Sequence, residues 1–219
     1  MLQLINVSKV YKNVNAIEEV SFTVDEGDSL GLVGNNGAGK STTLSIIATI
    51  MKPDSGQLLY RGIDIIKNPN AIRKELGYVP QDIALYMDLS GIENLKFWGK
   101  AYHIYGEALN QRIQAVCDII DIDSEQLKKT VKNYSGGMKR RLNIGAALLH
   151  DPKIVVMDEP TVGLDEESRL KILSAIKRLN ANGVTIVYTG HYLDEIKEIC
   201  NRICVLEAGR LVTIEGNRH

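Results

Sequence analysis

Residues 34–41 have the types and the spacing needed to hold a polyphosphate. They read Gly34-Asn35-Asn36-Gly37-Ala38-Gly39-Lys40-Ser41, with Thr42 next, which matches the pattern G-x-x-x-x-G-K-[ST]. Glycines let backbone N–H groups approach a phosphate closely, and these groups form an anion nest where a helix begins. Lys40 can reach the terminal phosphates with its ammonium group, and the Ser41 hydroxyl can ligate magnesium. The pattern therefore predicts a nucleotide-binding loop.

Two adjacent carboxylates follow an apolar run later in the chain. Residues 154–157 are all apolar, and Asp158 and Glu159 come directly after them. Such a run is typical of a buried parallel strand, and ligands of open α/β sheets bind at the carboxyl ends of their strands. We expect Asp158 to hold magnesium through water. Glu159, on the other side of the strand, can polarise an attacking water.

A second glycine-rich segment, Tyr134-Ser135-Gly136-Gly137-Met138, opens a predicted helix. It can be a second anion site, or simply a helix start that Ser135 caps. One chain does not need two such sites for one nucleotide. Two chains that face each other head to tail would use both.

The elements that position these residues can be predicted from the same sequence. Residues 2–7, 16–24, 29–34, 57–61, 154–157 and 184–189 have the apolar character of strands. Residues 44–51, 109–120, 168–180 and 193–203 have helical spacing, and Ser90 with Glu93 is a candidate capping box. Helices that alternate with apolar strands predict an α/β fold with a parallel sheet covered on both faces. The helical stretch between residues 81 and 151 is expected to be an insertion.

Composition narrows the function classes further. The net charge is −1, without a block of basic residues, so we expect no nucleic-acid partner. No apolar run reaches the roughly 20 residues that cross a bilayer, and the N-terminus lacks the pattern of a secretion signal. The three cysteines have no C-x-x-C spacing, which suits a reducing cytoplasm. Lys139, Arg140 and Arg141 are expected on a solvated face.

Taken in order, the motifs resemble those of the nucleotide-binding subunits of ATP-binding cassette transporters over essentially the whole chain. The resemblance implies a P-loop NTPase core of the RecA type, an N-terminal antiparallel β subdomain and an inserted helical subdomain. It implies one domain over residues 1–219, with 1–82 and 152–219 as catalytic core and β subdomain and 83–151 as helical signature subdomain.

The same resemblance implies the role of each site residue, with ATP and Mg²⁺ as cofactors. Catalysis is assigned to Glu159 as general base, His191 as switch histidine, Gln81 as lid glutamine, and Lys40. Magnesium is assigned to Ser41, Gln81 and Asp158. Nucleotide contacts are assigned to Tyr11 by adenine stacking, to Gly34, Asn35, Asn36, Gly37, Ala38, Gly39, Lys40, Ser41 and Thr42, and to Ser135, Gly136, Gly137 and Asp165.

Departures from the common family pattern are informative. Tyr134 and Met138 replace the most frequent Leu and Gln around the signature, and this form is similar to the ABC-2-type and multidrug exporter subgroup. Gly190 replaces the usual Ser or Thr before the histidine, with an effect that the sequence does not predict. Subunits of that subgroup often continue beyond the position of His219, so we expect a C-terminal extension to be missing.

The resemblance also implies partners and a location. We expect a second ATPase subunit, identical or homologous, and separately encoded transmembrane permease subunits, so that the chain sits peripherally at the cytoplasmic face of the cell membrane. The transported substrate and the partner's identity lie outside the chain. The aromatic residues of the helical insertion are the expected docking surface, namely Tyr86, Phe97, Trp98, Tyr102 and Tyr105.

Two alternatives remain at this point. A soluble, non-transport cassette ATPase that acts on ribosomes or DNA would usually carry two cassettes or long coiled coils, and neither is visible here. A phosphate-loop GTPase or small-molecule kinase would not need the Ser135-Gly136-Gly137 segment, and the chain has no Asn-Lys-x-Asp segment to read guanine.

Overall fold

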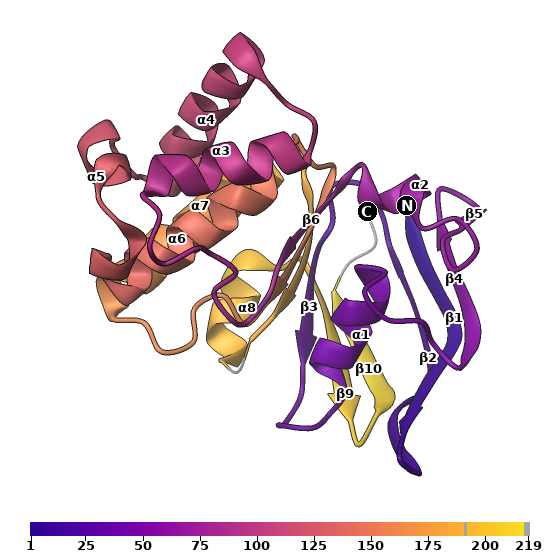
Figure 1. The fold of residues 1–219 in the computed structure, drawn as a ribbon. Helices are drawn as coiled ribbons and strands as arrows, with labels where there is room; N and C mark the ends of the chain where they lie inside the picture. Colours follow the sequence, from indigo (N-terminus) through magenta and orange to yellow (C-terminus); the bar gives the residue numbers. More distant parts are fainter. Residues whose placement is uncertain (191, 217–219) are drawn as a thin grey trace.

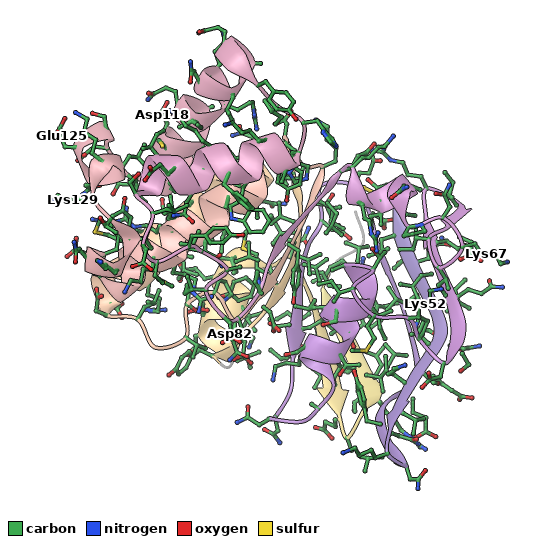
Figure 2. The ribbon with its side chains drawn as sticks, viewed as in Figure 1. Lys52, Lys67, Asp82, Asp118, Glu125 and Lys129 are labelled. Atoms are coloured by element: carbon green, nitrogen blue, oxygen red, sulfur yellow. The ribbon has the colours of Figure 1, made fainter. Side chains whose placement is uncertain are left out.

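The computed structural model describes residues 1–190 and 192–216. Figure 1 shows an N-terminal sheet on one side, a second sheet through the middle and a group of helices on the other side. In Figure 2, Lys67 and Glu125 mark opposite rims of the molecule, whereas Asp82, next to Gln81, lies between them. The segment around Gln81 and Asp82 thus lies between the N-terminal sheet and the helical group in this view.

The N-terminal sheet is antiparallel, with the order β2-β1-β4-β5. Its strands are β1 (Leu2–Tyr11), β2 (Val14–Val24), β4 (Ser55–Tyr60) and β5 (Ile63–Asp64). Lys12 and Asn13 connect β1 to β2 and both have positive φ, which is the backbone that a tight two-residue hairpin requires. This hairpin places Tyr11 at the end of β1.

The second sheet has the order β10-β9-β3-β8-β7-β6, and all of its neighbouring strands except β10 run parallel. The strands are β3 (Ser29–Val33), β6 (Leu76–Val79), β7 (Ile154–Asp158), β8 (Thr185–Thr189), β9 (Arg202–Glu207) and β10 (Arg210–Gly216). Since parallel strands end at the same edge, β3, β8 and β7 deliver their last residues side by side.

Helices cover both faces of this sheet, and β7 shows how the two faces are filled. Val155 and Met157 belong to a core cluster with α6, α7 and α8, whereas Ile154 and Val156 join α1 and the N-terminal sheet. Neighbouring residues of a strand point to opposite faces, so a strand buried on both sides is apolar throughout. The helices are α1 (Lys40–Ile47), α6 (Gly136–Leu148), α7 (Glu166–Ala181) and α8 (Leu193–Ile199).

The remaining helices gather around α6 in Figure 1. They are α3 (Gly91–Ala101), α4 (Gly106–Ile120), α5 (Ser124–Lys128) and the 3₁₀ helix η1 (Val131–Asn133), while the short α2 (Asn70–Arg73) precedes β6. The predicted capping box is present, because Ser90 Oγ accepts from the Glu93 N–H and the Glu93 carboxylate accepts from the Ser90 N–H.

The predicted fold class is confirmed. The predictions that are wrong concern where individual helices and strands begin and end. Residues 193–203 do not form one helix, because α8 ends at Ile199 and Arg202 begins β9 beside β3. The sequence pattern does not predict strand β6, because this strand is short and lies next to the helical stretch. The division into segments 1–82, 83–151 and 152–219 remains a prediction. Within the described residues, no helix has both the length and the apolar character that crossing a membrane requires.

The parallel sheet should dominate stability. Leu30 of β3 is fully buried in the cluster with α1, and we expect Leu30→Ala to lower the free energy of unfolding by about 2–5 kcal/mol. Leu170→Ala is the control, because that side chain is 48% exposed and its loss should cost less than about 0.5 kcal/mol. Urea unfolding measures both, and equal losses would contradict this account of the core.

Candidate active site

The glycine-rich loop connects the end of β3 to the start of α1. Gly39 precedes α1 with φ of 101°, and a Cβ atom there would lie 2.5 Å from the Ala16 carbonyl oxygen. Glycine is therefore required for its backbone and for its lack of a side chain. Because Gly39 cannot cap the helix with a side chain, the N–H groups of the first turn are available to an anion.

Lys40 is held inside this loop. Its Nζ donates to the carbonyl oxygens of Gly34 at 2.8 Å and Asn35 at 3.3 Å, and lies 3.7 Å from Glu159 Oε1. The side chain is only 5% exposed, and an ammonium group so buried needs such partners. Contacts within the protein therefore hold the lysine beside the Glu159 carboxylate.

A cleft of about 560 Å³ brings most of the predicted residues together. Gln81 and Glu159 come from distant parts of the chain, yet Gln81 Nε2 donates to Glu159 Oε2 at 3.0 Å. Gly34 and Asn35 line a neighbouring hollow that also contains Gly190. The predicted residues that line the main cleft are Tyr11, Asn36, Gly37, Ala38, Gly39, Lys40, Ser41, Thr42, Gln81 and Glu159.

Thr189 is a site residue that the sequence analysis missed. It ends β8 and is fully buried, its Oγ1 accepts from the Glu159 N–H at 3.0 Å, and its hydroxyl donates to Asp158 Oδ1 at 2.8 Å. One hydroxyl therefore holds the Asp158 carboxylate and the Glu159 backbone across the β7–β8 pair. The available signal was a polar residue at the carboxyl end of an apolar strand, where ligands bind.

Magnesium fits the donor set at this edge. Ser41 and Gln81 line the cleft, and the carboxylate of Asp158, 4% exposed, lies at the end of β7. Hydroxyl, amide and carboxylate oxygens suit this cation, which usually binds one or two carboxylates together with substrate phosphates. Burial first, and the charge of Asp158 second, raise the pKa of the neighbouring Tyr78.

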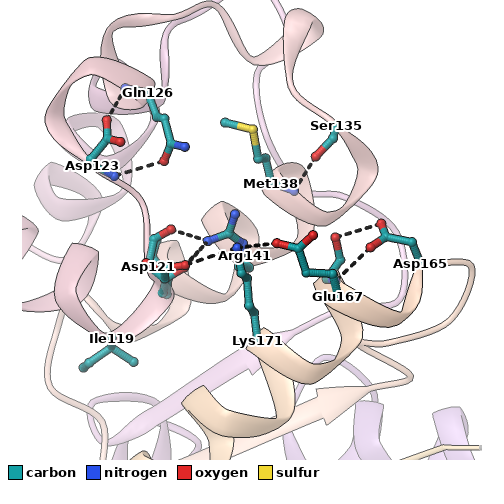
Figure 3. Close-up of polar contacts among 12 residues, drawn as sticks. Ile119, Asp121, Asp123, Gln126, Ser135, Met138, Arg141, Asp165, Glu167 and Lys171 are labelled. Carbon is teal, nitrogen blue, oxygen red and sulfur yellow. Dashed lines mark hydrogen bonds and ion pairs between the residues drawn. The ribbon is translucent and has the colours of Figure 1, made fainter.

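The signature residues face α7 in this chain. Ser135 caps α6 by accepting from the Met138 N–H at 3.2 Å, and a Cβ atom on Gly137 would collide with Ser168 Oγ. Asp165 accepts from the N–H and the hydroxyl of Ser168 (Figure 3). Among the described residues that line the cleft with Lys40, none comes from the signature or is Asp165.

The expectation of a solvated basic turn at residues 139–141 is wrong for its two arginines. Arg140 donates to the Pro80 carbonyl oxygen at 3.0 Å, and burial lowers the pKa of its guanidinium. Arg141 donates to the Ile120 carbonyl oxygen at 2.9 Å and joins Lys171 at the Asp121 carboxylate (Figure 3). Helix α6 is packed on several sides, so both cations turn to backbone carbonyls at its flanks.

The predicted switch residue His191 lies outside the described residues. The described residues on either side of it, Gly190 and Tyr192, follow β8 and precede α8.

Comparisons with known proteins agree with this geometry. The family model described as ABC transporter matches residues 17–162. The chain is 44% identical to the linearmycin resistance ATP-binding protein LnrL of Bacillus subtilis (strain 168), covering 98% of this chain and 68% of that protein. It is 36% identical to the Nod factor export ATP-binding protein I of Cupriavidus metallidurans, covering 100% and 72%.

Further similarity comes from more distant relatives. Identity to the daunorubicin resistance ATP-binding protein DrrA3 of Streptomyces coeruleorubidus is 33%, covering 93% of this chain and 64% of that protein. Among solved structures, the dimeric form of MJ0796, a bacterial ABC transporter cassette, superposes with a TM-score of 0.90 at 28% identity over 100% of both chains. The same cassette bound to ADP and Pi gives a TM-score of 0.89, at the same identity and coverage.

Thr189→Val should separate catalysis from folding. Valine keeps the shape but loses both hydrogen bonds to the acids, so we expect ATP hydrolysis to slow by about 10-fold, as for one hydrogen bond to a charged group. Thr185→Val is the matched control at the other end of β8, where the hydroxyl accepts from the Gly27 N–H and donates to Met1 Sδ, away from both acids. Equal steady-state rates of the two variants would contradict the role of Thr189.

Proposed function

Because this chain belongs to the ABC transporter family, we propose that it is the ATP-hydrolysing subunit which drives a separate membrane subunit of an exporter. ATP binding and hydrolysis are the activities of this family. One observation carries the assignment of the reacting groups. The Glu159 carboxylate is held by Gln81 at the mouth of the phosphate loop, 3.7 Å from the Lys40 ammonium group.

Glu159 is proposed as the general base. Its carboxylate takes a proton from the water that attacks the terminal phosphorus, a role typically worth about 10²–10⁴-fold in rate. Lys40 and the N–H groups of the loop hold the phosphate oxygens, Gln81 holds the Glu159 carboxylate, and Thr189 holds the Glu159 backbone. A magnesium ion held by Ser41, Gln81 and Asp158 would neutralise charge on the phosphates. Position 191 is proposed to contact the terminal phosphate.

A second subunit is proposed to complete each site. The signature of this chain faces α7 rather than its own phosphate loop, so it can serve a nucleotide bound by a facing copy or homologue. MJ0796 is described as dimeric, which supports this arrangement. Ser135, Gly136, Gly137 and Asp165 then act across the interface, while Tyr11, 42% exposed, is available to stack on the base.

Export is proposed from relatives that are named for linearmycin resistance, daunorubicin resistance and Nod factor export. The membrane subunit needs a docking surface. Tyr86, Met87 and Phe97 are exposed together, and the rings of Tyr86 and Phe97 meet edge to face at 4.7 Å. Exposed aromatic clusters are typical of binding sites. Trp98 and Tyr102 are partly buried and pack against the core, so the predicted docking surface rests mainly on the exposed aromatic residues. This partner would place the chain at the cytoplasmic face of the membrane.

Glu159→Gln tests the mechanism. The amide keeps the shape and cannot accept the proton, so we expect ATP binding to persist, turnover to fall by at least about 100-fold and a dimer to accumulate with ATP. Radiolabelled ATP binding, phosphate release and light scattering measure these three properties. Glu198→Gln, at an exposed ion pair with Lys177, is the control. Normal steady-state turnover of the Glu159 variant would contradict the role of Glu159 as general base.

Phe97→Glu tests the docking surface. A charge in the aromatic cluster should abolish co-purification of a membrane subunit from detergent-solubilised membranes, while the ATPase rate of the isolated chain stays within about 2-fold, because Phe97 lies outside the cleft. Val212→Glu, at a side chain 58% exposed on β10, should leave co-purification intact. Co-purification of ribosomal proteins or DNA instead would favour the non-transport alternative.

A further inference from the structure

A buried polar cluster joins the end of β8 to α8 and contributes no residue to the cleft described above. The Tyr188 hydroxyl and Thr161 Oγ1 both donate to Glu195 Oε1, the second at 2.7 Å. Arg169 donates to Glu195 Oε2 at 3.3 Å. Tyr188 is fully buried and Glu195 is 2% exposed, so this carboxylate depends on these donors in place of water.

The cluster joins the elements that carry the reacting groups. Tyr188 is on β8 next to Thr189, Thr161 follows Glu159 by two residues, and Glu195 is on α8. The bond between Tyr188 and Glu195 closes the chain segment that contains position 191. Burial, and the charge of Glu195, raise the pKa of the Tyr188 phenol, so the phenol remains a donor. Arg169 extends the cluster to α7, near the Asp165 cap.

Gly190 has a spatial reason in this arrangement. A Cβ atom there would lie 3.0 Å from Cε1 of the Tyr188 ring and 3.5 Å from Glu195 Oε1. Gly190 does not have a positive φ, so the tight space beside the Tyr188 ring, rather than backbone conformation, favours glycine at this position. Tyr188 and Gly190 are therefore a matched pair, in which the missing side chain admits the ring that reaches Glu195.

We propose that Tyr188, Gly190 and Glu195 are positioning residues that fix the backbone on both sides of position 191 relative to Glu159. None of the three lines the cleft that contains Lys40 and Glu159, and they act by holding the carboxyl end of β8 and the start of α8 against the loop after Glu159. The proposal rests on the proposed function, since it concerns the hydrolysis step there assigned to Glu159. Loss of these contacts should therefore lower the turnover number for ATP hydrolysis and leave the affinity for ATP unchanged.

Tyr188→Phe removes only the hydroxyl. We expect kcat for ATP hydrolysis to fall by roughly 10-fold, as for one hydrogen bond to a charged group, and KM for ATP to change by less than about 2-fold. Tyr60→Phe is the matched control. Tyr60 is on β4, away from the cleft, and its hydroxyl also donates to a carboxylate, that of Glu75, at 2.6 Å. Thermal unfolding of both variants is followed in parallel, so that a common loss of stability is separated from a loss of turnover.

Gly190→Ala gives a second and independent readout. It should lower kcat in the unmodified chain, where the new Cβ meets the Tyr188 ring, and have no further effect in a Tyr188→Leu background. Independent, multiplicative effects of the two changes would overturn the pairing. An unchanged kcat in Tyr188→Phe would overturn the positioning role, whereas no ATPase activity in the unmodified chain would contradict the proposed function instead.

Discussion

The buried carboxylate of Glu159 is the group around which the rest of the site is arranged. A carboxylate that is 5% exposed needs donors or cations in place of its water, and here Gln81 donates to it and Lys40 lies 3.7 Å away. The same requirement holds Lys40 inside its loop and sets Thr189 beneath both strand-end acids. Function and stability therefore use the same contacts, because displacing Gln81 or Lys40 would remove part of the compensation of a buried charge.

Strand order makes this arrangement possible. β8 lies between β3, which leads into the phosphate loop, and β7, which ends in the two acids. The carboxyl end of β8 consequently lies between the strand that leads into the phosphate-binding loop and the strand that ends in the two acids. Thr189, the last residue of β8, contacts the Asp158 carboxylate and the backbone N–H of Glu159, so the end of this strand holds the segment that carries both acids. The hydrogen bonds of Tyr188 and Thr161 to Glu195 hold this edge of the sheet against α8.

Contacts of α6 show how nucleotide binding can reach the helical group. Arg140 of α6 holds the carbonyl oxygen of Pro80, directly before Gln81, and Gln81 holds Glu159. At its other side, Gly137 packs on Ser168, which binds Asp165. These contacts connect Gln81 to the helix that starts at the signature, and α3, which carries Phe97 of the exposed aromatic cluster, packs against that helix.

Local patterns in the sequence determined the phosphate loop, the strand-end acids, the capping box at Ser90 and the amphipathic helix α4, because each depends on residues a few positions apart. Their combination was enough to predict the fold class. Only the tertiary structure decided that Thr189 holds the segment that carries both acids, that Arg140 turns inward to Pro80, and that Gly190 makes room for Tyr188. These contacts join residues far apart in the chain or depend on the space around one atom, and neither periodicity nor composition reports which groups meet when separate strands and helices pack.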